Sequence, residues 1–263
     1  MRATTLSGIF VLAITACLGS GCDEEKKPTA AKPAATAAVP APAPAAPSTA
    51  PVKEEPKPAR PKKTAADCPK TSSVTFPNAD FEAAVRLKTQ KKDGNITFAD
   101  LAKVRSLNIS QSKLTELDVC ILPHMKELRE LFIGPGDVED LSPIAGLTKL
   151  ESLRLSLNPI RDLAPLAAMT KLDRLDLAHT QVRDLTPLKS LTNLTELLLD
   201  DTPIDDVSPL ASLEKLNVLV LKNTRVKDVR ALRSLKALKT LDLRGAPVDD
   251  STVLARPGLR IDE

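Results

Sequence analysis

The hydrophobic positions of this chain repeat at a fixed interval over its second half. Each repeating unit opens with the pattern LxxLxLxx, in which apolar and polar positions alternate after the fourth residue. Alternation with a period of two predicts a short strand that buries one face. The opening leucine recurs in steps of 22 residues, at Leu128, Leu150, Leu172, Leu194, Leu216 and Leu238. With a longer unit that begins at Val104, the pattern predicts about seven units over residues 104–263.

Each unit contributes a few leucines, which are too few for a separate core. Stacked units share one continuous core and pair their strands into a parallel sheet. After its strand, each unit turns back through an aspartate that is often followed by Ser-Pro or Thr-Pro. We expect the aspartates to bond to backbone N–H groups and the Ser or Thr to cap short helical turns. The aspartates are Asp140, Asp162, Asp184, Asp206, Asp228 and Asp250, and the capping residues are Ser142, Thr186 and Ser208.

The ninth position of the unit is a small polar residue in five of the seven units. The chain leaves the sheet at this position, so a polar side chain there can bond to buried backbone groups. We therefore predict a structural role for Ser112, Asn158, Thr180, Thr202 and Thr224.

Residues 68–103 precede the repeats and predict a helical N-terminal cap. Phe81, Val85 and Leu101 are apolar at helical spacing, and Thr97 with Asp100 has the spacing of a capping box. We expect three phenylalanines to close the open end of the core: Phe76, Phe81 and Phe98.

One stretch of this cap, residues 93–97, has the sequence DGNIT and resembles half of a calcium-binding loop. In that alignment Lys91 takes the place of a metal ligand, and an ammonium group cannot bind a cation. The stretch therefore predicts a turn.

The repeats resemble the internalin-like leucine-rich repeats of bacterial surface proteins, whose units read LxxLxLxxNxIxDLxPLxxLTx. The match extends over residues 128–237, and FPNADFEAAVRLKTQKKDGNITFADLAKVRSLNIS resembles the N-terminal cap of that family. The resemblance implies an α/β solenoid: a leucine-rich-repeat horseshoe with a parallel sheet on its concave side, short helical turns on its convex side and an α-helical cap. It also implies that the concave face binds a protein partner non-covalently.

The N-terminus has the features of an export signal. The apolar run of residues 6–16 follows Arg2 and is too short to span a bilayer as a helix. The sequence ITAC, ending at Cys17, resembles the lipobox of bacterial lipoproteins, which implies a signal peptide over residues 1–16 and lipidation of Cys17. Cys22, after GSG, is the alternative lipidation site, and an ordinary cleaved signal peptide is a third interpretation. Attached acyl chains would hold the protein on a membrane.

Residues 17–67 are rich in Pro, Ala and Lys and have no apolar periodicity. Such a composition cannot bury a core, so it predicts a disordered tether between the anchor and the cap. We therefore expect an exported protein that is lipid-anchored to the bacterial cell envelope, on its periplasmic side or at the cell surface.

Two further cysteines, Cys68 and Cys120, lie in the cap and the first repeat. In an exported protein they are expected to form a disulfide, with Cys22 as a competing partner if cleavage occurs before Cys17.

The sequence contains no recognisable catalytic motif, and it has two histidines. The spacing of Cys120 and His124 suits zinc, but two further ligands are missing. Four aspartates follow closely at Asp200, Asp201, Asp205 and Asp206, yet the first pair is predicted near the sheet and the second on the return segment. We therefore expect no enzyme activity, no cofactor and no metal site.

Charge argues against nucleic acid as a partner. Residues 68–263 contain 28 Lys and Arg and 28 Asp and Glu, so the repeats have no net basic field. We expect a monomer that contacts a protein and, through its lipid, a membrane. Opposite charges on neighbouring strands are expected to pair across the sheet, as Arg154–Asp176, Arg174–Glu196 and Lys222–Asp200.

The candidate binding residues are apolar side chains at positions where the repeat does not require them. They are Phe132, Leu157, Leu198, Val218 and Val220. An exposed apolar cluster is typical of a contact surface, although β-propensity alone also places aliphatic residues on strands. Aromatic residues make up 2% of the chain, and they dominate tight interfaces. The alternatives to protein binding are a passive structural or spacer module of the envelope, or a glycan-binding module.

Overall fold

The computed structural model describes residues 64–69, 73–76 and 78–263. The expected signal peptide, both candidate lipidation sites and most of the expected tether lie outside the described residues. Among the described residues, none of the helices is both long enough and apolar enough to cross a membrane.

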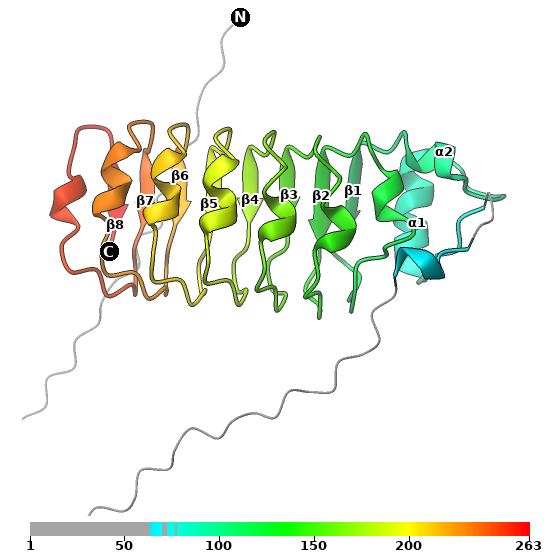
Figure 1. The fold of residues 1–263 in the computed structure, drawn as a ribbon, viewed down its shortest axis with the longest axis horizontal. Helices are drawn as coiled ribbons and strands as arrows, with labels where there is room; N and C mark the ends of the chain where they lie inside the picture. Colours follow the sequence, from blue (N-terminus) through cyan, green and yellow to red (C-terminus); the bar gives the residue numbers. More distant parts are fainter. Residues whose placement is uncertain (1–63, 70–72, 77) are drawn as a thin grey trace, which may run out of the picture. The chain divides into compact units, whose positions relative to one another are not determined.

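The repeats form one parallel sheet whose eight strands follow one another in chain order. Figure 1 shows the coils stacked in a row from the cap to the C-terminal strand β8, with the helical segments on the side opposite the strands. This arrangement confirms the predicted solenoid. The strands are β1 (Ser106–Ile109), β2 (Glu130–Ile133), β3 (Ser152–Arg154), β4 (Arg174–Asp176), β5 (Glu196–Leu198), β6 (Val218–Val220), β7 (Thr240–Asp242) and β8 (Arg260–Asp262).

The register keeps equivalent positions of successive units side by side. Leu153 pairs with Leu175, and Leu175 pairs with Leu197, so the central leucine of each strand stacks on the next. These leucines are fully buried, whereas the residues on either side of them reach the opposite face of the sheet. The C-terminal segment also forms a strand of the sheet, because β8 pairs in register with β7.

The return segments are short 3-10 helices, because a unit of 22 residues leaves no room for a longer helix. They are η2 (Leu122–His124), η3 (Ser142–Ile144), η4 (Ala164–Leu166), η5 (Thr186–Ser190), η6 (Ser208–Ser212), η7 (Arg230–Ser234) and η8 (Thr252–Leu254). Serines tie neighbouring segments together: the Ser190 hydroxyl donates to the Ala167 carbonyl at 2.6 Å, and Ser212 donates to Lys189 at 2.9 Å.

The predicted role of the aspartates is confirmed, but the predicted capping role of Ser142, Thr186 and Ser208 is wrong. The N-cap residues are Leu141, Leu185 and Val207, so each Ser or Thr is the first residue of its 3-10 helix and not its cap. The carboxylate two residues earlier accepts the backbone N–H instead, at 2.8 Å for Asp140 and Ser142. The same bond recurs at Asp162, Asp184, Asp206, Asp228 and Asp250. A carboxylate accepts more strongly than a hydroxyl, so the aspartate sets the turn.

Polar side chains at the ninth position satisfy buried backbone groups, as predicted. The hydroxyls of Thr180, Thr202 and Thr224 donate to the carbonyls three residues earlier, at 2.5–2.7 Å. Asn158 does more, because its amide donates to the carbonyls of Gly134, Leu155 and Ser156, and its oxygen accepts from Val138 N.

The cap consists of η1 (Ala65–Asp67), α1 (Ala79–Thr89) and α2 (Phe98–Leu101). Phe81 is buried in the core, and Phe76 and Phe98 pack against the core while remaining partly exposed. The predicted capping box is confirmed: the Thr97 hydroxyl accepts from Asp100 N, and the Asp100 carboxylate accepts from Thr97 N.

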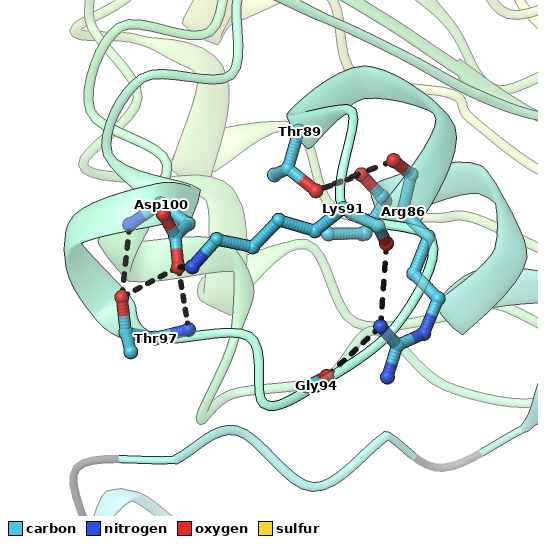
Figure 2. Close-up of polar contacts among 7 residues, drawn as sticks. Arg86, Thr89, Lys91, Gly94, Thr97 and Asp100 are labelled. Atoms are coloured by element: carbon cyan, nitrogen blue, oxygen red, sulfur yellow. Dashed lines mark hydrogen bonds and ion pairs between the residues drawn. The ribbon is translucent and has the colours of Figure 1, made fainter.

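Basic side chains hold the loop that resembles a calcium site. The Lys91 ammonium lies 2.7 Å from Asp100 Oδ2, and the Arg86 guanidinium donates to the carbonyls of Lys91 and Gly94 at 3.3 and 3.0 Å (Figure 2). The loop is a turn, as predicted, and its oxygen atoms bind the side chains of Lys91 and Arg86. The hydrogen bonds from Lys91 and Thr97 hold the pKa of the Asp100 carboxyl well below its usual range.

Replacing Asp100 by asparagine should lower the free energy of unfolding at pH 7 by about 1 kcal/mol, because a charge-assisted bond and half of the capping box are weakened. A carboxyl with a depressed folded pKa stabilises the protein above its unfolded pKa, and this contribution is lost as pH falls towards the folded value. Urea denaturation should therefore show the difference between the two proteins at pH 7 and a smaller one below about pH 3. A constant difference at both pH values would contradict the role of the charge.

Candidate protein-binding face

We call the outward side of the eight strands the sheet face. Two in-register columns of side chains line it. The first column is Ser106, Glu130, Ser152, Arg174, Glu196, Val218, Thr240 and Arg260, and the second is Asn108, Phe132, Arg154, Asp176, Leu198, Val220, Asp242 and Asp262. The repeat fixes the residue type at the core positions but not at the positions of these two columns.

Three of the candidate residues form a cluster on β5 and β6. Leu198 and Val220 are register partners, and Val218 lies beside Glu196 on the neighbouring column. All three side chains are partly exposed. Polar residues occupy the same columns on both sides of the cluster, at Asp176 and Asp242. We call Leu198, Val218 and Val220 the apolar cluster.

Phe132 is separated from this cluster by β3 and β4. Its side chain is half-buried, whereas its position in the repeat predicts a freely exposed side chain. The Arg154 guanidinium lies over its ring, 5.6 Å from the centroid, and also pairs with Asp176 at 3.0 Å. This cation–π contact covers the ring and accounts for the lower exposure.

Leu157 lies in the turn that follows β3, not on a strand. Its side chain is 48% exposed, and its backbone is left-handed with φ 60°. The equivalent residues of the following units have the same backbone but are types that tolerate it: His179, Asp201, Asn223 and Gly245. Leucine is unfavourable here on both counts, because its backbone is strained and its apolar side chain meets water.

The charged side chains of the sheet face form only some of the cross-strand ion pairs that were predicted from the sequence. Arg154 and Asp176 form the expected cross-strand pair, but the Arg174 guanidinium lies 3.6 Å from Asp173 instead of bonding to Glu196. A long exposed side chain reaches several acids at similar cost, so strand register alone does not select its partner.

One group of titratable side chains on neighbouring coils was not predicted from the sequence. The imidazole of His179 lies between the carboxylates of Asp200 and Asp201, with Nε2 3.7 and 3.6 Å from their Oδ2 atoms. These three are the residues of the described chain whose donor atoms lie close enough together to hold a metal ion. The signal was available, because residues 179 and 201 are 22 positions apart and therefore adjacent in the solenoid.

The remaining histidine and the cap cysteines are engaged elsewhere. Cys68 and Cys120 form a disulfide with an S–S distance of 2.06 Å, so Cys120 has no thiolate to offer a metal. The ring of His124 packs on Phe98, with centroids 4.2 Å apart. Leu87, on the outer side of α1, is 75% exposed and stands apart from the sheet face.

The parallel sheet, the 22-residue coils and the helical cap define a leucine-rich-repeat protein. The sequence agrees, because residues 170–212 match the family model described as leucine-rich repeats in two copies. No curated protein matches the chain in sequence.

Solved structures place the chain more narrowly. It is 33% identical to internalin C2 of Listeria monocytogenes, with a TM-score of 0.66 over 71% of this chain and 83% of that one. It is 28% identical to the internalin InlF of the same organism, with a TM-score of 0.65 over 71% of this chain and 55% of that one. The chain belongs to the internalin-type leucine-rich-repeat proteins. A leucine-rich-repeat protein of Leptospira interrogans shares the fold at 21% identity, with a TM-score of 0.52 over 62% of this chain and 50% of that one.

Proposed function

We propose that this protein is a lipid-anchored module of a bacterial cell envelope that binds a protein partner with its sheet face. The anchor is supported by the short apolar run and the lipobox-like sequence at Cys17, with Cys22 as the alternative. Residues 17–67 would form the tether, 68–103 the cap and 104–263 the binding module.

The apolar cluster is the observation that carries the binding proposal. The core of the solenoid is complete without Leu198, Val218 and Val220, because the stacked leucines behind them are fully buried. Strand propensity favours such residues one at a time, but it gives no reason for three to meet on β5 and β6. Contiguous apolar surface between polar residues is typical of a protein contact.

Leu157 supports the same proposal independently. Its left-handed backbone costs about 1 kcal/mol relative to a tolerant residue, and its apolar side chain is exposed at the same position. We infer that Phe132 on β2 and Leu157 after β3 form a second contact, which lies three and two coils, respectively, before the apolar cluster on β5 and β6.

The test is crosslinking of the protein in envelope preparations, followed by mass spectrometry of what it captures. The variant Leu198→Lys, Val220→Lys removes the apolar cluster and places each ammonium beside an existing acid, Asp176 or Asp242. The matched control, Ser106→Lys, Asn108→Lys, adds the same charge to the same face on β1. Capture of a specific protein should survive in the control and fail in the cluster variant. Equal capture by both would contradict the proposed face, and no capture by the native protein would favour a spacer role.

Leu157→Asn separates binding from folding. Asparagine already occupies the equivalent position at Asn223 with φ 55°, so the free energy of unfolding should rise by about 1 kcal/mol. Capture of the partner should fall at the same time. A variant that is more stable and captures the partner equally well would remove Leu157 from the contact.

Lipid attachment is tested separately by metabolic labelling with a palmitate analogue. The label should be lost in the Cys17→Ser variant and persist in the Cys22→Ser variant. The reverse result would assign the anchor to Cys22. Label in both variants, or in neither of them, would contradict a single lipidated cysteine.

A further inference from the structure

We propose that His179, Asp200 and Asp201 form a binding site for a divalent transition-metal ion such as zinc. One imidazole nitrogen and two carboxylate oxygens are a common ligand set for zinc, whereas calcium takes six to eight oxygen atoms. In a tetrahedral zinc site, bonds of about 2.1 Å place donor atoms about 3.4 Å apart. The imidazole nitrogen lies 3.7 and 3.6 Å from the two carboxylate oxygens, and all three donor atoms lie within 4.8 Å of one another, so side-chain rotations would be needed to close the site.

The ion pairs of Asp200 and Asp201 differ from those of the acids in the second column of the sheet face. The acids of the second column each have an arginine partner: Asp176 has Arg154 at 3.0 Å, Asp242 has Arg244 at 2.5 Å, and Asp262 has Arg260 at 2.9 Å. Asp200 and Asp201 face a histidine instead.

Lys222 is the residue on the neighbouring coil that was predicted to pair with Asp200. In the described part of the chain it forms an ion pair with neither carboxylate. The two adjacent carboxylates converge on the imidazole and repel each other, and a bound cation would relieve this repulsion.

The backbone directs the three donors to one point. Successive residues of an extended chain point to opposite sides, but the left-handed turn at Asp201, with φ 54°, brings its carboxylate back towards His179. Asn223, one coil further on, donates from Nδ2 to Asp201 Oδ1 at 2.9 Å. This bond leaves Oδ2 facing the imidazole, and such outer hydrogen bonds are how proteins orient metal ligands.

The other coils show that the repeat does not require this arrangement. The left-handed turn favours His and Asp individually, but it does not account for Asp200, whose column holds Ala178 before it and Lys222 after it. The equivalent triplet one coil earlier is Leu157, Ala178 and His179, which has one donor instead of three. The site is therefore specific to β4 and β5. Three protein ligands leave a coordination position for water or for a donor from a partner protein.

The experiment is calorimetric titration of zinc chloride into the oxidised full chain without a histidine tag. Cys17 and Cys22 are replaced by serine in every protein, so that thiolates do not contribute. We expect saturable binding of one zinc ion per chain. His179→Asn and Asp201→Asn should each weaken it at least about 10-fold, and Asn223→Gly, which removes a positioning residue, by about 10-fold.

These variants are chosen to fold. Asparagine and glycine already stand in equivalent left-handed turns at Asn223 and Gly245, and circular dichroism checks the result. Asp205→Asn is the control, because it removes the same charge from an exposed aspartate outside the group. Absence of saturable zinc binding, or binding that His179→Asn leaves unchanged, would overturn the site. Equal losses of zinc affinity in Asp205→Asn and Asp201→Asn would show that zinc is attracted by the negative charge of the surface in general, and this result would also overturn the site. None of these outcomes bears on the apolar cluster.

Discussion

Replacing Cys68 by serine and Cys120 by alanine should lower the free energy of unfolding by about 4 kcal/mol, the largest effect that we expect from any change in the cap. The disulfide joins residues separated by 52 positions, and in the chain-entropy model a loop of this length gains about that amount. The bond connects the segment before α1 to the first coil, so it holds the cap against the open end of the core.

Urea denaturation followed by circular dichroism measures this loss. Reduction of the native protein should reproduce it, whereas the variant should not respond to the reductant. Because neighbouring coils stabilise each other in a solenoid, the cap of the variant is expected to unfold first, which hydrogen exchange of the α1 amides would detect. A loss below about 1 kcal/mol would show that packing of Phe81 and Val85 suffices to hold the cap.

Replacing Asn158 by alanine should cost about 3 kcal/mol. The side chain is buried, and its amide satisfies three carbonyls and one backbone N–H in two successive coils. Each buried polar group left without a partner costs about 1–3 kcal/mol, and partial entry of water lowers the sum. The expected loss therefore exceeds that of an ordinary single hydrogen bond.

Asn158→Thr is the matched control, because threonine occupies the same position in later coils. The Thr180 hydroxyl satisfies one carbonyl, that of Leu177, at 2.7 Å. Threonine at 158 should therefore recover about 1 kcal/mol of the loss. If alanine and threonine destabilised the protein equally, the asparagine would be acting through its shape and not through its hydrogen bonds.

Local chemistry explains why some expectations failed. The aspartate turns could be predicted from the sequence, because a carboxylate accepts a hydrogen bond from an N–H two residues later, and this local contact does not depend on the rest of the fold. The capping role of Ser142 was not, because two neighbouring side chains compete for one N–H and the sequence does not rank them. Arg174 similarly forms its ion pair with Asp173 and not with Glu196. The choice depends on rotamers, which neither register nor composition specifies.

The sequence by itself determined the solenoid, the parallel sheet, the buried leucines and the position of the cap. These follow from a 22-residue period, because each coil repeats the same local contacts and the period alone places coil on coil. The sequence also named the residues of the apolar cluster, since they break the repeat.

Only the tertiary structure decided which side chains meet between coils. It covered Phe132 with Arg154 and directed Asp201 back to His179 through a left-handed turn. Such contacts depend on backbone dihedrals and side-chain rotamers at single positions, and a repeating pattern of apolar and polar residues carries no information on either.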